Sequence, residues 1–197
     1  MRWKQYSGIA VALWLVIENG MGQGLLVDQA SGTLAETIVN GSVIPQNDLA
    51  QSFTRSLSAV AFVQLRTLIT LPSGSTVTLV VNLRDGAYNG PIISSTTAVD
   101  IVGFADIGTF YFPDNIPVTP GQLYFFQPVL QSNGSLSIGT KSPSPYTNGD
   151  LWTNGLRDPN ADLWFREGVV VPEPGAVWLF VLGCIAFLWR WRVGTRS

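Results

Sequence analysis

The sequence predicts an all-β fold, an antiparallel β-sandwich that lies between two apolar ends. Short runs of alternating apolar and polar residues recur along the middle of the chain. Turns rich in Gly, Pro and Asn separate these runs. The middle has no window with a sustained helical period of 3.6 residues, so we expect about eight strands packed in two layers.

Composition separates the ends from the middle. Of the 197 residues, 46% are hydrophobic and 12% are charged, whereas roughly 25% are charged in an average globular protein. The apolar excess lies at both ends, while residues 23–171 hold six basic and eleven acidic side chains, a net charge of −5. Because nucleic-acid binding needs a basic surface, we expect no nucleic-acid partner.

Residues 1–22 have the parts of a secretory signal peptide. Arg2 and Lys4 precede the apolar residues 9–17 (IAVALWLVI), and small residues follow at Gly20 and Gly22. Nine apolar residues are too few to span a bilayer, which takes about 20 helical residues. We expect a signal helix that is cleaved after Gly22, with a retained N-terminal anchor as the alternative.

The strands are expected between the turns. The longest alternating segments are residues 58–71 (SAVAFVQLRTLITL) and 75–83 (STVTLVVNL), and the turn Asp85-Gly86 closes the second. The other expected strands are 33–39, 51–55, 92–97, 108–112, 122–130, 135–139 and 162–167.

Several short motifs of this region occur in a familiar order. They are residues 49–54 (LAQSFT), Asp85-Gly86, Asn89-Gly90-Pro91, 108–112 (GTFYF) and 118–124 (VTPGQLY). Together they resemble the choice-of-anchor class of bacterial surface domains, over about residues 45–130. The resemblance implies a jelly-roll-like sandwich at the cell surface and names no ligand.

The C-terminal end contains a second apolar segment. Residues 175–189 (GAVWLFVLGCIAFLW) would form a helix about 22 Å long, against a hydrocarbon core of about 30 Å. Arg190, Arg192 and Arg196 follow it, and the positive-inside rule assigns them to the cytoplasm and the body to the outside. We therefore expect a C-terminal transmembrane helix.

Pro172, Glu173 and Pro174 stand directly before this segment. The tripeptide, the short apolar helix and the terminal arginines together resemble the PEP-CTERM sorting signal of exported bacterial proteins. That resemblance implies an exosortase as partner, which removes the helix while the protein passes from the inner membrane to the cell surface. A permanent inner-membrane anchor with a periplasmic sandwich is the alternative. The expected organisation is a signal peptide (1–22), a sandwich domain (23–168) and a sorting tail (169–197).

The residue types present limit the chemistry. The chain has no histidine, and its one cysteine, Cys184, lies in the C-terminal apolar segment. A Ser-His-Asp or Cys-His site, a zinc site and a disulfide framework are therefore not expected in the domain. Two carboxylates could hydrolyse a glycoside, but no pair stands out. We expect no catalytic residues, and a carboxylate-based glycoside hydrolase remains the alternative.

One polar segment has the ligand types of a calcium loop. Asp158, Asn160 and Asp162 supply oxygens at alternate positions, and Asp150 lies nearby. An EF-hand loop has Gly at its sixth position and Glu at its twelfth, but Leu163 and Val169 occupy these positions. Calcium is the one cofactor considered, and an ordinary surface turn is the alternative.

Three aromatic residues near that segment could stack on a sugar ring. Tyr146, Trp152 and Trp164 have the flat faces that this requires, although such residues often fill the core of a sandwich instead.

Taken with the terminal signals, these features lead us to expect an exported surface or extracellular-matrix protein with a non-catalytic structural or carbohydrate-binding role. Extracellular polysaccharide is the corresponding partner.

Overall fold

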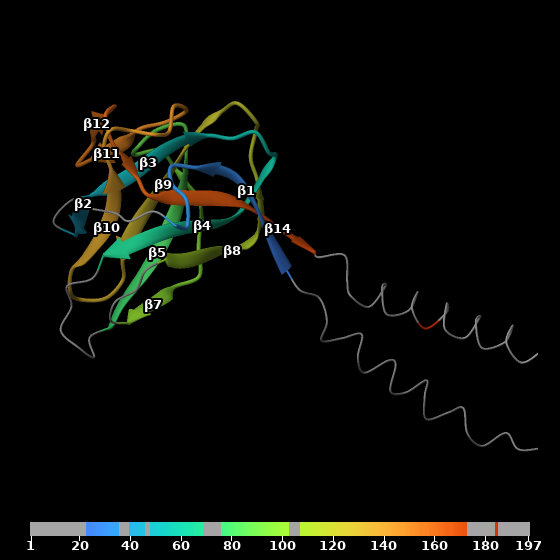
Figure 1. Cartoon of the computed structure of the whole chain (residues 1–197), viewed down its shortest axis with the longest axis horizontal. Coiled ribbons are helices and arrows are strands. Elements are labelled where there is room, and N and C mark those ends of the chain that lie inside the picture. The colour runs from blue at the N-terminus through green and yellow to red at the C-terminus, as the bar shows by residue number, and fades with distance from the viewer. Residues whose placement is uncertain are drawn as a thin grey trace, which may run out of the picture. The chain divides into compact units, whose positions relative to one another are not determined.

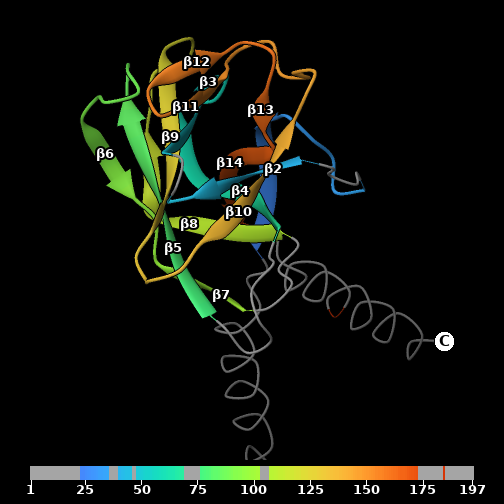
Figure 2. The same cartoon turned by 90° about the vertical axis from the view of Figure 1, so that its left-hand side faces the viewer.

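The computed structural model describes residues 23–35, 40–45, 48–68, 76–102, 107–172 and Cys184. These residues form 14 strands in two antiparallel sheets, which confirms the predicted all-β class. Contacts divide the chain into two units, and Leu26–Val170 form the unit that holds the two sheets. Figures 1 and 2 together label the strands, and Figure 2 shows β5, β6 and β9 on one side and β4, β10 and β14 on the other.

The first sheet is built around β4. Its order is β1 (Gln23–Ala30), β14 (Phe165–Pro172), β4 (Ala59–Leu68), β10 (Leu136–Lys141) and β13 (Asp162–Leu163), with β8 (Ile107–Pro117) on β4 and β2 (Asn40–Ile44) on β10. β4 pairs with β14, β8 and β10, and its eight central residues are all buried. Burial on both faces explains why apolar residues occur on both faces of this strand.

The second sheet has one buried and one more exposed face. Its order is β12 (Leu156–Asp158), β11 (Leu151–Thr153), β3 (Leu49–Thr54), β9 (Leu123–Leu130), β5 (Thr76–Asp85) and β6 (Ile92–Ser95), with β7 (Val99–Val102) also paired to β5. Along β5, buried and more exposed residues alternate from Thr76 to Arg84. The alternation visible in the sequence is therefore the period of a strand with one face in the core.

The core lies between the sheets and is rich in aromatic residues. Phe126 on β9 is 5.6 Å from Phe53 on β3 and 5.0 Å from Phe165 on β14, measured between ring centroids. All three rings are completely buried. These contacts join the two sheets, and packed aromatic pairs of this kind add to the hydrophobic stabilisation of the body.

The structure extends the strand assignments made from the sequence. Seven expected strands (51–55, 58–71, 75–83, 92–97, 108–112, 122–130 and 135–139) correspond to β3, β4, β5, β6, β8, β9 and β10. The sequence did not indicate β1, β2, β7, β11 and β12. Of the expected strand 33–39, residues 33–35 are not in a strand, and 36–39 lie outside the described residues. The last expected strand, 162–167, is divided into β13 and β14 at Trp164.

The expected terminal signals fall almost entirely outside the described residues. Residues 1–22, Glu173, Pro174, Arg190, Arg192 and Arg196 belong to this undescribed part, while Cys184 is helical. Pro172 is the last residue of β14, which continues four residues past the domain end expected at 168. Within the part of the chain that the structure describes, no helix has the length and hydrophobicity needed to span a bilayer.

Candidate functional site

The β11–β12 hairpin positions the aromatic residue that best fits a surface site. Its turn is Asn154-Gly155, with φ of 53° at Asn154 and 78° at Gly155. Asn and Gly adopt this left-handed region most readily, and a tight two-residue hairpin requires it. On β11, Trp152 pairs with Ala50 of β3 and with Arg157 of β12. The hairpin therefore attaches Trp152 to the second sheet.

Trp152 and Tyr88 form an aromatic pair on the outer face of that sheet. Trp152 points outward because the preceding Leu151 belongs to the core and side chains alternate along a strand. The Tyr88 ring stacks on Trp152 at 5.8 Å between centroids, with 21° between the ring planes. Phe125 meets Trp152 edge-on at 5.6 Å. Trp152 and Tyr88 are both half-buried, so this pair reaches the surface.

Polar side chains fix Tyr88 in position. Its hydroxyl donates to one carboxylate oxygen of Asp48 at 2.5 Å, and Gln127 donates to the other oxygen at 2.5 Å. The Nε of Arg84 in turn donates to Gln127 at 2.7 Å. Burial and the hydrogen bond to Asp48 raise the pKa of Tyr88 to about 12, so its hydroxyl remains a donor at neutral pH. The arrangement can offer a rigid aromatic surface beside an exposed carboxylate.

Two of the three rings expected to stack on a sugar are in the interior. Trp164 is completely buried and Tyr146 is 6% exposed. The Tyr146 ring packs edge-on against Phe165 at 5.2 Å, and the guanidinium of Arg66 lies 5.3 Å from the centre of the Trp164 ring. Neither ring can offer a free face to a ligand, which corrects the expected three-residue platform to Trp152 alone.

The carboxylate of Asp162 is used inside the protein. Its Oδ2 accepts hydrogen bonds from Ser144 Oγ at 2.6 Å and from the Tyr146 N–H at 3.0 Å, and its Oδ1 accepts from Gln51 Nε2 at 3.0 Å. Gln51 Oε1 accepts from the Leu163 N–H at 2.7 Å. Burial raises the pKa of Asp162 although these hydrogen bonds act in the opposite direction. Asp162 therefore links β13 to β3.

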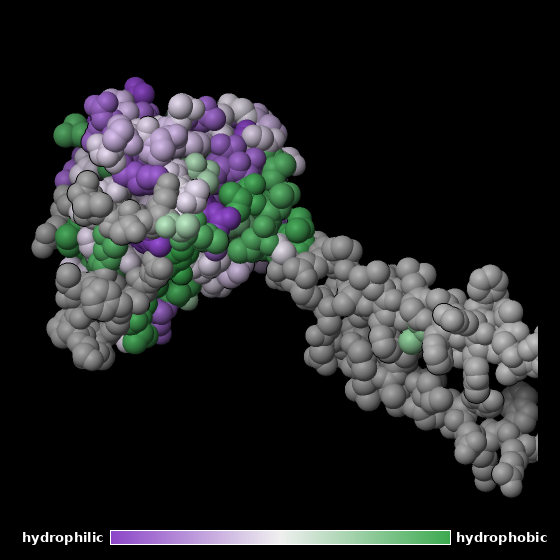
Figure 3. All heavy atoms as spheres, viewed as in Figure 1, coloured by the Kyte–Doolittle hydropathy of each residue, from purple (hydrophilic) through white to green (hydrophobic). Residues whose placement is uncertain are grey.

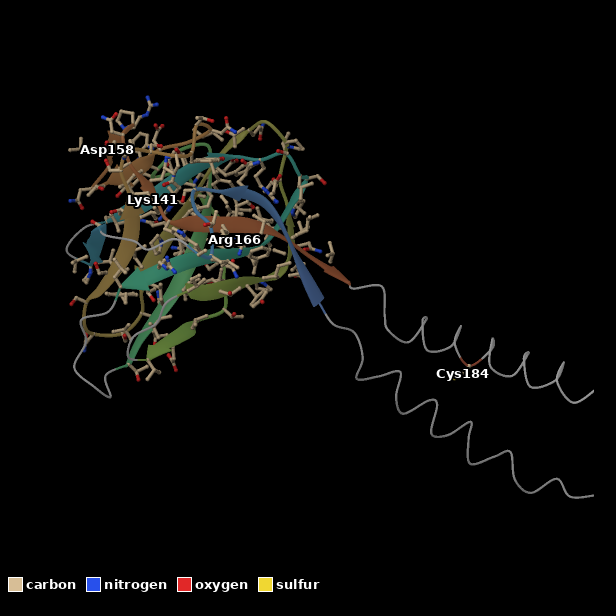
Figure 4. All side chains as sticks on the ribbon, in the orientation of Figure 1. Lys141, Asp158, Arg166 and Cys184 are labelled. Atoms are coloured by element: carbon tan, nitrogen blue, oxygen red, sulfur yellow. The ribbon has the colours of Figure 1, made fainter. Side chains whose placement is uncertain are left out.

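Asp158 and Asn160 are exposed at the end of β12 and just after it, whereas the Asp162 side chain is buried. Asp158 is exposed at the end of β12, as Figure 4 shows, and its Oδ1 accepts from the Asn160 N–H at 3.0 Å. Asp150 instead pairs with Arg157 at 2.7 Å. Among the described residues, no group of three acidic or cysteine side chains is placed to hold a metal ion. Asp158 and Asp162 accept hydrogen bonds within the protein, and the calcium loop stays a prediction.

A buried charged cluster was not foreseen from the sequence. The Nε of Arg55 lies 3.1 Å from Asp28 on β1 and 3.1 Å from Glu167 on β14. Burial alone would raise the pKa of Asp28, but the N–H groups of Leu57 and Ser56 and the Arg55 guanidinium hold that pKa below its ordinary value. Burial raises the pKa of Glu167 to about 8. The three residues are far apart in sequence, so no local pattern could reveal the cluster.

Comparisons with protein-family models, with curated proteins and with solved structures find no match for this chain. The described part is an all-β body of two antiparallel sheets that carries one half-exposed aromatic pair. Its function therefore has to be inferred from the sequence and from this geometry.

Proposed function

We propose that the chain is an exported bacterial surface protein with a non-catalytic structural role, delivered by an exosortase. The observation that carries this proposal is that the described strands all lie between the two expected signals. The first described strand, β1, spans Gln23–Ala30, and the last, β14, spans Phe165–Pro172. Removal of both signals would leave all the strands of the sandwich in one piece.

The path of the chain supports a jelly-roll-like body for this role. From β3 to β10, each longer strand lies in the other sheet from the one before it: β3, β5 and β9 in the second sheet, β4, β8 and β10 in the first. Repeated crossing between two sheets is typical of double-sheet jelly rolls. Such a body needs neither a disulfide nor a metal to bury a core, which suits a chain whose domain has no cysteine.

The buried and paired acidic residues support a structural rather than a catalytic role. Asp28 and Glu167 contact Arg55, and Asp150 pairs with Arg157. Asp162 accepts three hydrogen bonds inside the body. Each of these carboxylates therefore has a partner that holds strands or turns together.

The proposal is tested by the intact mass and location of the protein in a host that makes an exosortase. We expect a species that begins at Gln23, ends within Pro172 to Pro174 and is found at the surface or in the medium. Pro174→Ala should leave the tail uncut, whereas Pro159→Ala, in the turn after β12, should be processed normally. An uncut wild-type chain in the inner membrane would overturn exosortase sorting and favour a permanent anchor.

Carbohydrate binding is a second candidate, favoured by the Trp152–Tyr88 pair. The pair is half-buried and next to the carboxylate of Asp48, and sugars stack on aromatic faces while their hydroxyls bond to neighbouring polar groups. The test is a glycan array with the full-length protein, with and without calcium. We expect binding that Trp152→Ala abolishes and Leu156→Ala, at the exposed hairpin, leaves unchanged. An array without any binding would remove this candidate.

A further inference from the structure

Strand β1 forms one edge of the first sheet. It pairs with β14 on one side, and no other described strand pairs with it on the other. The strand has eight residues, QGLLVDQA, and alternate ones direct their backbone N–H and C=O groups away from β14, toward the side where no described strand pairs. An edge of this kind is a template on which another strand can add.

The other edge strands have features that oppose such pairing. β2, β6, β7, β12 and β13 contain only two to five residues each. β8 is longer but includes Pro113 and Pro117, which lack the N–H that a ladder needs. Short strands and prolines are the means by which proteins protect their sheet edges. Among the strands that the structure describes, β1 is the long edge without them.

The side chains of β1 make its edge favourable for pairing. The strand has no lysine, arginine or proline, and its one charge, Asp28, has a side chain that is 5% exposed and held by Arg55. Leu25 and Leu26 are 38% and 48% exposed. Figure 3 shows apolar residues gathered at the side of the body where Figure 1 labels β1 and β14. The edge thus combines backbone groups that no described strand pairs with exposed leucines and a charge held by Arg55.

We propose that β1 pairs in antiparallel orientation with β1 of a second copy of this chain, so that the first sheets of two bodies become continuous. A twofold axis across the strand would put the same surface on both sides of the interface, which is the usual symmetry of homodimers. The leucines of one copy would then lie beside those of the other. Because Arg55 holds Asp28 toward the body, no like charges would meet across the interface.

This inference goes beyond the proposed function and does not depend on it. Pairing through β1 requires only the folded body, whereas exosortase processing requires the tail. A failure of tail cleavage in the host would leave the pairing proposal intact. Equally, a protein that is sorted as proposed but remains monomeric would overturn the pairing alone.

The first experiment is disulfide trapping in the full-length protein, purified in detergent. In a Cys184→Ser background, single cysteines are introduced in turn by Leu25→Cys, Leu26→Cys and Val27→Cys. The matched controls are Val102→Cys on β7 and Leu156→Cys on β12, which are even more exposed, at 61% and 75%. Under mild oxidation, we expect dimers to form about tenfold faster or more at one β1 position, because pairing raises the effective concentration of the two thiols.

A second experiment measures association without a cross-link. Analytical ultracentrifugation of the full-length chain should show dimers that Leu26→Lys shifts to monomers, because an edge lysine opposes strand addition. Leu156→Lys should leave the dimer fraction unchanged. The proposal is overturned if the wild-type chain is monomeric at every concentration, or if no β1 cysteine reacts faster than both controls. It is also overturned if Leu26→Lys and Leu156→Lys leave the same dimer fraction.

Discussion

The Nε of Arg55 lies 3.1 Å from a carboxylate oxygen of Glu167, and both side chains are completely buried. Among the described atoms, neither terminal nitrogen of this guanidinium and neither oxygen of Glu167 has a hydrogen-bond partner. Arg55 also contacts Asp28, so a single buried cation lies between two acidic side chains. We therefore expect the free energy of unfolding to depend on pH and on the presence of each of these three side chains.

The first prediction is that stability falls as the pH rises from about 4.5 to about 8. Burial raises the pKa of Glu167 to about 8 in the folded protein, against an ordinary value of 4.5. Between these values the folded state binds the proton and the unfolded state does not, so the free energy of unfolding must decrease with pH. This loss is complete above pH 8 and absent below pH 4.5. Urea unfolding of the full-length protein in detergent at pH 5 and pH 8.5 measures it.

The matched variant for this prediction is Glu167→Gln, which keeps the shape and removes the titration. In this variant, the free energy of unfolding should fall less between pH 5 and pH 8.5 than it does in the wild type. Asp28 acts in the opposite sense: its lowered pKa contributes stability above about pH 4 that is lost as the pH falls through the folded-state pKa. An unchanged slope in Glu167→Gln would show that another group, such as the buried Asp162, controls the decline.

The second prediction concerns Arg55 itself. Arg55→Met leaves Asp28 and Glu167 buried without their cation, so we expect a loss of about 3–5 kcal/mol in the free energy of unfolding. The double variant Arg55→Met with Glu167→Met should lose less than Arg55→Met alone, because one unpaired acid is then replaced by an apolar side chain. Denaturant unfolding of the wild type, Arg55→Met, Glu167→Met and the double variant at pH 8.5 gives the coupling. Purely additive losses would mean that Arg55 and Glu167 do not interact.

The sequence predicted the fold where a strand has one face in the core. On β5, Val77, Leu79, Val81 and Leu83 are buried and alternate with more exposed residues, so a period of two was visible. The alternation of buried and exposed residues does not hold at Trp164 and Phe165, which are both completely buried. The reason is that the chain changes strand partner there. The Trp164 N–H donates to Gly139 at the β10 side, whereas Phe165 pairs with β4.

The candidate site could be predicted only in part. Trp152 stood out as an aromatic residue within a polar segment, and it does reach the surface. Its stacking with Tyr88 could not be predicted, because the two residues are more than 60 positions apart in the chain. The bond from Tyr88 to Asp48 also joins segments 40 residues apart. Likewise, nothing local distinguishes Asp162, which is buried, from Asp158, which is exposed. The difference arises from where Gln51 and Ser144 lie.

The third prediction tests a close approach of two backbone segments. A Cβ at Gly149 would lie 1.9 Å from the backbone oxygen of Ser52 and 3.0 Å from the Tyr146 ring. Because a backbone atom cannot move aside easily, Gly149→Ala should lower the free energy of unfolding by about 2 kcal/mol or more. Gly86→Ala is the control, since a Cβ there meets open space and only the φ of +65° is unfavourable, at about 1 kcal/mol. Equal losses in thermal unfolding would contradict the close approach.

The fourth prediction compares the two tryptophans of the body. Trp164 is completely buried, so Trp164→Ala should cost about 3–5 kcal/mol through lost burial and the cavity left behind. Trp152→Ala removes a half-buried side chain and should cost clearly less. Denaturant unfolding followed by circular dichroism checks this order without relying on tryptophan fluorescence. A larger loss of unfolding free energy for Trp152→Ala than for Trp164→Ala would mean that the Trp152–Tyr88 pair mainly stabilises the fold and is not a surface for a ligand.

The last prediction follows from the hydrogen-bond directions around Asp162. An Asn at this position must point its NH2 group either at the Tyr146 N–H or at Gln51 Nε2, and both of these are donors. Gln51 cannot reverse its amide without losing the bond from the Leu163 N–H to its Oε1. Asp162→Asn should therefore leave a buried donor unsatisfied and lower the free energy of unfolding by about 1–3 kcal/mol. Asp158→Asn, at an exposed residue that accepts one local bond, should change stability by about 0.5 kcal/mol or less. If both variants instead lost a stabilisation that appears only when calcium is added, Asp162 would be a ligand and not a link between β13 and β3.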